Sequence, residues 1–288
     1  MKFGSVENPD EVDFSLPKDH PDTKQVLSTV PEKEELDIYV GCAKWNKKDL
    51  KGFYPRGTKD ELPYYSTQFN SIEMNTTFYH FPRREQVKIW KDKTPDGFKF
   101  FPKITNTISH FKQLREVKEL MYDYCKEIEA FEEKLGMLFL QLHGNFSPDR
   151  IERLEKALVD FPVEIPLAVE LRHPDWFTSP FSDQYYKILK ETNKANIIVD
   201  TAGRRDMVHM RLSTPVAFVR WVGANHPSDY TRLDEWINRI KEWKEQGLQQ
   251  LYFFVHQNIE MESPLLSAYF VENLNKAIGS NLHIPKTL

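Results

Sequence analysis

Short apolar runs alternate with longer amphipathic segments along most of the chain. Most of the runs are continuous rather than strictly alternating, which is typical of strands covered on both faces in a parallel sheet. We expect eight strands, at Ile38–Cys42, Ser71–Asn75, Phe98–Lys103, Met137–Leu142, Leu167–Leu171, Asn196–Asp200, Val216–Trp221 and Leu251–His256. Because eight parallel strands close a barrel, the pattern predicts an α/β fold of the TIM-type (β/α)8 class.

The segments between these strands have helical periodicity. Apolar residues recur at spacings of three or four positions from Leu114 to Phe131, Ile151 to Phe161 and Leu233 to Trp243, which places them on one face of a helix. Helices are also expected to begin at Ser147-Pro148 and Ser263-Pro264, because serine caps a helix and proline suits its first turn. We interpret these stripes as core packing.

Two stretches depart from this alternation. The connection Thr201–Thr214, between the sixth and seventh strands, has no clean helical period, so we expect the sixth helix to be missing or replaced by a loop. Residues 1–36 contain four prolines, many charges and few apolar residues, and we predict an extended N-terminal arm. Residues 37–288 would then form a single TIM-type barrel domain, close to the typical length of about 250 residues.

The composition supports a globular domain, with 40% hydrophobic and 28% charged residues. The formal net charge of −4 opposes strong attraction of the whole protein to nucleic acid or anionic membranes, but it leaves room for a local basic patch. Cys42 and Cys125 offer no disulfide framework, so we interpret them as buried thiols and expect a cytoplasmic location.

No segment suggests contact with a membrane. Met1–Val12 lacks the apolar run of a signal peptide, and we expect no targeting segment. No stretch approaches the roughly 18 apolar residues that span a bilayer. We therefore expect a soluble protein.

Several motifs at the expected strand ends resemble those of the YecE-like family, catalogued as domain of unknown function 72. The most specific are Glu73–Tyr79 (EMNTTFY) and Glu170–Trp176 (ELRHPDW). Others are Tyr39–Trp45, Gly52–Pro55, Thr94–Phe100 with Lys103, Ser109-His110 and Leu140–Leu142. The resemblance implies a barrel similar to those of the xylose isomerase and endonuclease IV group, and it implies no activity, because none is agreed for the family.

The chain departs from the family pattern at three strand ends. Members commonly have Arg-x-His-Gly after strand seven, where this chain has Arg220–Gly223 (RWVG). Many carry paired asparagines at strand eight, where this chain has His256–Asn258 (HQN), and His143 replaces a proline that often follows strand four. If the family shares one chemistry, this member has changed it at the rim of strands seven and eight.

Polar residues at the carboxyl ends of barrel strands face the mouth of the pocket, so we expect a ligand site there. The acid/base catalysts would be Glu73 and Glu170. The substrate-binding residues would be Trp45, Asn75, Lys103, Gln141, Arg172, His173, Asp200, Arg220 and Asn258. Among these, Lys103, Arg172 and Arg220 form the expected anion-binding pocket. The alternative for Glu73 is a structural ion pair with Arg172 or Lys103.

We predict no metal and no other cofactor, because no HExxH or Cys-x-x-Cys spacing supports one. A metal set could still be drawn from Glu170, His173, Asp200, His143 and His256. The favoured function is hydrolase or isomerase-like acid/base chemistry on a small phosphate- or sugar-containing ligand. The alternatives are a nucleic-acid-binding module whose basic rim includes Arg204, Arg205 and Arg211, and a non-catalytic metabolite-binding barrel.

Overall fold

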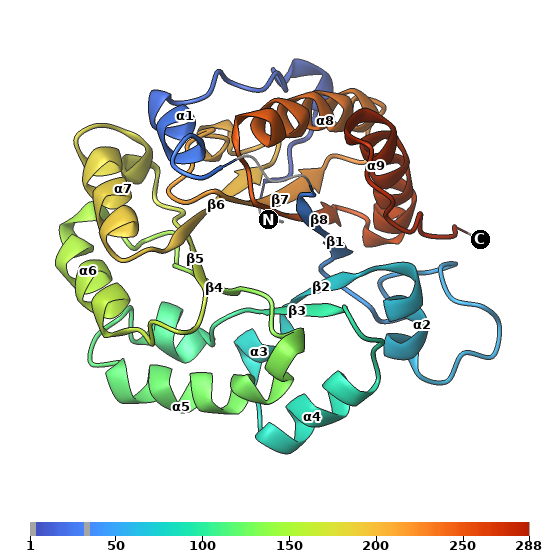
Figure 1. Cartoon of the computed structure of the whole chain (residues 1–288), viewed down its shortest axis with the longest axis horizontal. Coiled ribbons are helices and arrows are strands. Elements are labelled where there is room, and N and C mark those ends of the chain that lie inside the picture. Colours follow the sequence, from blue (N-terminus) through green and yellow to red (C-terminus); the bar gives the residue numbers. More distant parts are fainter. Residues whose placement is uncertain (1–3, 32–34, 288) are drawn as a thin grey trace. The chain divides into compact units, whose positions relative to one another are not determined.

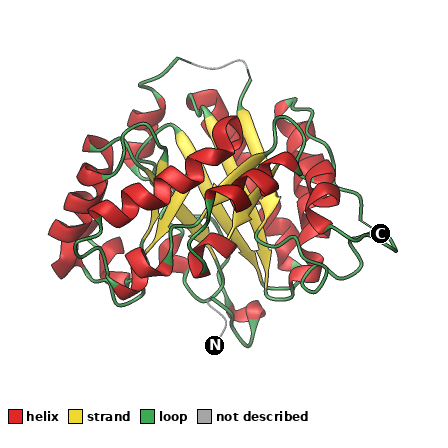
Figure 2. Cartoon of the chain, turned by 90° about the horizontal axis from the view of Figure 1, so that it is seen from below, coloured by secondary structure: helices red, strands yellow, loops and turns green. Residues whose placement is uncertain are grey.

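The computed structural model describes residues 4–31 and 35–287. Helices and strands alternate along the chain and are joined by loops (Figure 2). All eight expected strands are present, with ends within two residues of the prediction. They are β1 Asp37–Cys42, β2 Ser71–Met74, β3 Lys99–Pro102, β4 Leu138–Gln141, β5 Leu167–Glu170, β6 Ala195–Asp200, β7 Val216–Gly223 and β8 Gln250–Gln257.

The helices include those predicted from apolar periodicity. The α-helices are α1 Pro21–Leu27, α2 Glu61–Gln68, α3 Thr76–Tyr79, α4 Arg84–Asp92, α5 Lys118–Ile128, α6 Ile151–Asp160, α7 Phe181–Glu191, α8 Ser228–Gln246 and α9 Ser263–Ile278. The short helices are η1 Pro9–Glu11, η2 Thr107–Phe111, η3 Glu129–Lys134, η4 Pro148–Arg150, η5 Pro174–Phe177, η6 Arg205–Met207 and η7 Glu260–Glu262.

The chain divides into two compact units. The terminal unit comprises Met1–Ile72 and Ile198–Leu288, and the central unit comprises Glu73–Ile197. The boundaries fall inside β2 and β6, so each of these strands contributes residues to both units.

Six strands are hydrogen-bonded in the order β1-β8-β7-β6-β5-β4, and β2 pairs with β3 in a second sheet. The β1–β8, β7–β8, β4–β5 and β5–β6 pairs are parallel. The α/β class and the parallel sheet are therefore confirmed. The single closed ring of eight strands is not shown, because ladder pairing among the described residues gives two sheets. Within the central unit, β3 and β4 have four residues each, and isolated bridges such as Lys103–Phe139 replace a continuous ladder between them.

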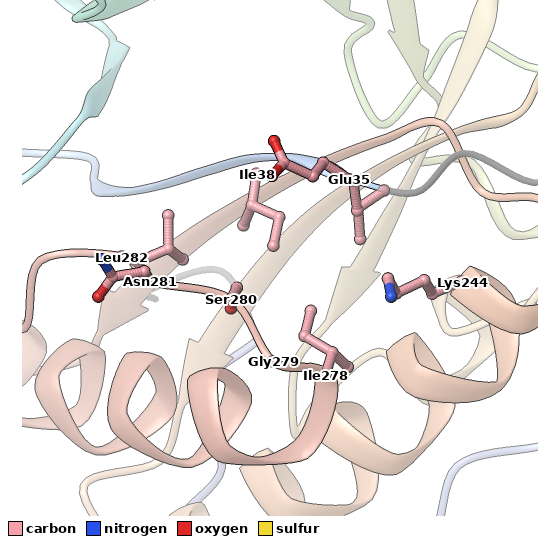
Figure 3. A pocket seen from close by; sticks show the side chains of 9 residues that line it. Glu35, Ile38, Lys244, Ile278, Gly279, Ser280, Asn281 and Leu282 are labelled. Carbon is pink, nitrogen blue, oxygen red and sulfur yellow. The ribbon is translucent and has the colours of Figure 1, made fainter.

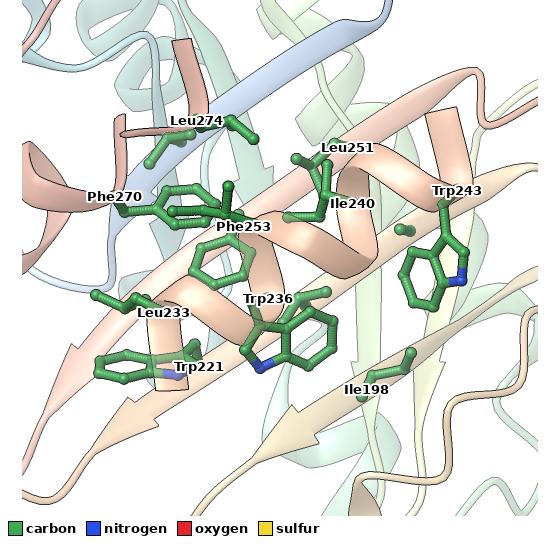
Figure 4. Packing of buried hydrophobic residues seen from close by; sticks show 14 of the residues in the cluster. Ile198, Trp221, Leu233, Trp236, Ile240, Trp243, Leu251, Phe253, Phe270 and Leu274 are labelled. Carbon is green, nitrogen blue, oxygen red and sulfur yellow. The ribbon is translucent and has the colours of Figure 1, made fainter. Parts of the chain in front are cut away.

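Helices α8 and α9 cover one side of β7, β8 and β1 in the terminal unit (Figure 1). The apolar stripe predicted on α8 is buried, and Trp236 and Trp243 face the strands (Figure 4). The Phe253 ring of β8 stacks on the Phe270 ring of α9 with centroids 4.0 Å apart. These contacts explain why the apolar positions repeat with helical spacing.

The described residues of the N-terminal arm belong to the terminal unit and include the helices η1 and α1. Between β6 and β7 the described chain has only the short helix η6, which confirms that a sixth α-helix is missing. Leu27 of α1 joins the same core cluster as Met210 and Leu212 from this connection. The backbone N–H of His20 donates to the carbonyl of Met210 at 3.0 Å. The arm therefore covers apolar surface that the short connection leaves open.

In the central unit, α5 and α6 bury the stripes that the sequence indicated. Met121 and Tyr124 of α5 are buried, as is Leu154 of α6. The first predicted helix begins later than expected, at Lys118, because Gln113, Leu114 and Glu116 have φ angles of 47°, 61° and 46°. Left-handed backbone at these positions cannot continue a right-handed helix. None of the described helices is both long and apolar enough to span a lipid bilayer.

Candidate functional site

Polar side chains from three strand ends meet in the central unit. Lys103 follows β3, Gln141 ends β4, and Arg172 follows β5. The Lys103 Nζ donates to Gln141 Oε1 at 2.9 Å, and the Arg172 Nη2 donates to the same oxygen at 2.7 Å. Two cationic groups therefore converge on one neutral amide oxygen. We use the name central polar cluster for these three residues, Glu170 and the hydrogen-bonded pair Glu73 and Asn75 at the end of β2.

The two carboxylates proposed as catalysts are completely buried, with exposed fractions of 0% for Glu73 and Glu170. The Arg172 Nε donates to Glu170 Oε1 at 2.7 Å, and the Asn75 Nδ2 donates to Glu73 Oε1 at 2.8 Å. These bonds hold each carboxylate oxygen in place, as buried charged groups require. The Arg172 side chain keeps 19% of its surface exposed and so links the cluster to solvent.

Two histidines and a phenylalanine extend the cluster. The Lys103 Nζ lies 4.1 Å from the centre of the Phe78 ring, and the Phe78 and His110 rings are 4.9 Å apart. The His110 and His143 rings meet edge to face at 5.1 Å. Burial, together with the charges of His143, Lys103 and Arg172, lowers the pKa of His110 to about 4. His110 is therefore a neutral imidazole at pH 7.

The predicted site did not include His110 or Phe78. The sequence feature that could have indicated His110 is the Ser109-His110 motif shortly after β3. In the structure the Ser109 Oγ lies 3.0 Å from His110 Nδ1. His143, which replaces the common proline after β4, supplies the ring that contacts His110. His143, one of the positions where this chain departs from the family pattern, therefore lies next to the cluster.

His173, predicted to bind substrate, has a local structural role. Its Nδ1 accepts a hydrogen bond from the backbone N–H of Asp175 at 3.3 Å and caps the short helix η5. A histidine before proline can satisfy a free N–H at a helix start. We therefore leave His173 out of the proposed site.

Asp200, at the end of β6, is enclosed within the terminal unit. Its Oδ1 accepts from Arg232 Nη2 at 2.8 Å and from Arg205 Nη1, and its Oδ2 accepts from Trp236 Nε1 at 2.7 Å. The Phe14 ring of the arm covers the Arg232 guanidinium at 4.4 Å. A carboxylate that is saturated by three internal donors stabilises the fold, so Asp200 is also left out of the proposed site.

Backbone N–H groups in the loop after β7 already bind a carboxylate. Asp229 of α8 accepts from the backbone N–H groups of Ala224 at 2.9 Å and His226 at 3.2 Å. The Gln257 side chain accepts from the Asn225 N–H at 3.1 Å and donates to Asp229 at 3.1 Å. These internal acceptors occupy the backbone donors that a phosphate would need.

Of the other predicted residues of the terminal unit, two follow a strand and one lies within a strand. Trp45 follows β1, with its carbonyl bound by the Tyr54 hydroxyl. Arg220 of β7 is 7% exposed, and Asn258 follows β8 and is partly exposed.

The arginines proposed for a nucleic-acid rim are engaged internally. Arg204 makes two hydrogen bonds to Asp206, at 2.8 and 2.7 Å, and Arg211 makes two to Asp22, at 3.0 and 2.6 Å. Arg205 binds Asp200, as described above.

Three other features bear on where a ligand or metal could bind. Within the described residues, no group of three or more His, Cys, Asp or Glu side chains is placed to hold a metal ion. Both cysteines are free and buried, as expected, and burial raises the pKa of Cys42 and raises that of Cys125 to about 12. A pocket of about 280 Å³ lies at the start of β1, away from the carboxyl ends of the strands, and is lined by Ile38, Lys244 and Ile278 among others (Figure 3).

A known family matches most of the chain. The family model described as "Protein of unknown function DUF72" matches residues 39–287. The UPF0759 protein YecE of Escherichia coli is 26% identical over 264 residues, covering 84% of this chain and 94% of that protein. The matched region begins after the N-terminal arm.

Solved structures of the same family have a similar fold. A DUF72 family protein from Enterococcus faecalis aligns with a TM-score of 0.68 at 18% identity, covering 84% of this chain and 99% of that one. A DUF72 family protein from Thermotoga maritima aligns with a TM-score of 0.65 at 25% identity, covering 83% and 99%.

Proposed function

This chain belongs to the DUF72 family of proteins of unknown function, and we propose that it binds a small, hydroxylated anion of the sugar phosphate class at the central polar cluster. The proposal includes hydrolase or isomerase-like acid/base chemistry by the cluster carboxylates. It also includes a complete (β/α)8 barrel as the scaffold, which the eight strands and the similarity to solved relatives support.

The observation that carries the proposal is the shared acceptor at Gln141. Lys103 and Arg172 direct two positive charges at one uncharged oxygen, 2.9 and 2.7 Å away. Like charges repel, and an anionic oxygen at this point would stabilise both cations more than an amide oxygen does. A phosphate or carboxylate that displaces the Gln141 side chain would meet both groups.

The remaining groups suit a hydroxylated ligand. The Glu73–Asn75 pair offers both a hydrogen-bond acceptor and a donor, as a sugar hydroxyl requires. The edge-to-face rings of Phe78 and His110 provide apolar surface beside Lys103. Glu170, held as a carboxylate by Arg172, would accept a proton from the ligand and return it to the product, and the neutral His110 offers a second acceptor nitrogen.

The binding test is calorimetric titration with a hexose monophosphate, the free hexose and inorganic phosphate. We expect Lys103→Met and Arg172→Gln each to weaken binding of the phosphate ester by at least about tenfold, equivalent to about 1.4 kcal/mol. Lys88→Met and Arg83→Gln remove the same residue types from exposed positions on or beside α4, and should leave binding unchanged.

Thermal melts of each variant separate lost binding from lost folding, and Arg172→Lys should keep part of the affinity because it keeps the charge. Binding without chemical change of the ligand, followed by NMR, would identify a metabolite-binding protein without catalysis. If folded Lys103→Met and Arg172→Gln bind as tightly as the unmodified protein, the cluster is not the site.

Nucleic-acid binding has less support. The three rim arginines already have carboxylate partners within the terminal unit, two of them through paired hydrogen bonds. A guanidinium would have to exchange such a partner for a phosphate, so its contribution to backbone binding would be small.

A further inference from the structure

We propose that a groove between α5 and α6 is a second ligand site, specific for an oxyanion attached to an apolar chain. Arg153 of α6 would bind the anionic group. The groove lies entirely within the central unit and includes none of the residues of the central polar cluster.

The groove has the size and lining of a small-molecule site. Its volume is about 560 Å³, within the range of roughly 300–1,000 Å³ found for ligand pockets. Its apolar lining consists of Leu114, Val117, Met121 and Ala157. Its charged lining consists of Arg115, Glu116, Lys118, Glu152, Arg153, Lys156 and Asp160.

Arg153 supplies the evidence for a missing partner. Its Nη1 is shielded from solvent and has no hydrogen-bond partner among the described residues. A buried N–H of a charged group without an acceptor costs free energy. The two groove lysines differ, because Lys118 and Lys156 both pair with Asp160, at 3.2 and 3.1 Å. Arg153 is therefore the groove cation for which a ligand would supply the missing acceptor.

The chemistry of Arg153 selects the kind of ligand. A guanidinium presents parallel N–H groups that match the two oxygens of a carboxylate or phosphate. The exposed Arg115 lines the same groove and adds positive charge. The apolar lining next to this charge would accept a hydrocarbon chain, so an anion with an aliphatic tail fits both parts of the groove.

The backbone before α5 shapes one wall. Gln113, Leu114 and Glu116 adopt left-handed φ angles, so the chain turns before α5 begins instead of extending the helix. Leu114 and Val117 are thereby buried against the unit, at 5% and 3% exposure, while Arg115 and Glu116 remain outside. A continuous helix through this segment would remove this wall.

The test is calorimetric titration with octanoate, octyl phosphate and inorganic phosphate. Both octyl compounds should bind the unmodified protein, and Arg153→Gln should weaken their binding by at least about tenfold. Inorganic phosphate alone should bind much more weakly, because it lacks the tail. Glu152→Gln removes an exposed negative charge from the groove and should strengthen binding about twofold to fivefold at low salt.

Arg83→Gln is the matched arginine control and should change nothing. Lys103→Met should also leave octanoate binding intact, which separates this site from the sugar phosphate proposal. Absence of octanoate and octyl phosphate binding would overturn the inference. Equal affinity in Arg153→Gln would overturn it as well, as would inorganic phosphate binding as tightly as octyl phosphate.

Discussion

Replacing Asp200 by asparagine should destabilise the terminal unit strongly. The carboxylate accepts hydrogen bonds from Arg232, Arg205 and Trp236, and it has no exposed surface. Asparagine has nearly the same shape, but its amide NH2 group is a donor. It would face either the arginines or the Trp236 N–H, which are also donors.

The expected loss follows from the burial of the partners. Removing one member of a buried ion pair costs about 3–5 kcal/mol. Arg232 is 2% exposed and keeps its bond to Asp229 at 3.0 Å, so it retains one negative partner. We therefore expect a loss of about 3–4 kcal/mol, in the lower part of that range. With a urea dependence of about 3 kcal/mol/M, the unfolding midpoint should fall by roughly 1 M.

The assay is urea unfolding followed by tryptophan fluorescence, because Trp236 contacts Asp200 directly. The matched control is Asp206→Asn. Asp206 also makes two hydrogen bonds to an arginine, but its side chain is 36% exposed, and its loss should cost less than about 1 kcal/mol. Equal effects of the two substitutions would refute the reasoning that burial makes the Asp200 pairs important.

The ion pairs of Asp200 should also make the stability of the fold depend on pH in acid. Burial alone would raise its pKa, but Arg232 and Arg205 outweigh burial and lower the pKa below the ordinary 3.8. The stabilisation is therefore present above that ordinary value and is lost as pH falls through the lower, folded value.

Two further substitutions test other contacts. His110 has a pKa near 6.5 in the unfolded chain and about 4 in the folded chain, so the unfolded chain takes up the proton first as pH falls. The free energy of unfolding should therefore decrease by about 1–2 kcal/mol as pH falls from 6.5 to 4, after allowance for the partial exposure of the ring. His110→Gln should flatten this part of the urea-midpoint profile against pH, and an unchanged slope would contradict it. Phe14→Ala removes the ring over Arg232 and should cost about 1–2 kcal/mol in urea unfolding. The control Phe111→Ala, at a position 76% exposed, should cost almost nothing, and an equal loss in both would contradict the role of the arm contact.

The positions of the strands could be predicted from the sequence because their apolar runs are buried on both faces. The partners of each strand could not, since an apolar run carries no information about ladder length. β2 and β3, with four residues each, form a separate sheet, whereas β7 and β8 pair over eight residues. Sequence reasoning thus established the elements and the class, but not the closure of the sheet.

The residues of the candidate site could be predicted where position at a strand end is enough to bring side chains together. Lys103, Gln141 and Arg172 follow directly from the rule that polar residues at the carboxyl ends of neighbouring strands meet. His173 and Asp200 occupy similar positions, yet both already have partners within the protein. The N–H of Asp175 engages His173, and Arg232, distant in sequence, engages Asp200. The sequence alone does not show which of several possible partners a polar side chain will bind.

The arm shows the same limit. Its prolines and charges predicted an extended segment, and residues 4–20 do lack long helices. Its attachment depends on long-range polar contacts that no local pattern reveals. Trp243 Nε1 donates to Asp19 at 2.9 Å, and the Gly203 N–H donates to the Gly4 carbonyl at 2.9 Å.

The missing sixth helix and the arm are best understood together. The family match begins at residue 39, so the arm lies outside the shared domain. Yet the short β6–β7 connection places Met210 and Leu212 in the core without a covering helix of its own. Leu27 of α1 is completely buried in that cluster. Apolar surface of this kind favours burial by about 25 cal/mol per Å². The arm therefore completes the core of the terminal unit and is part of its fold, in contrast to a removable tail.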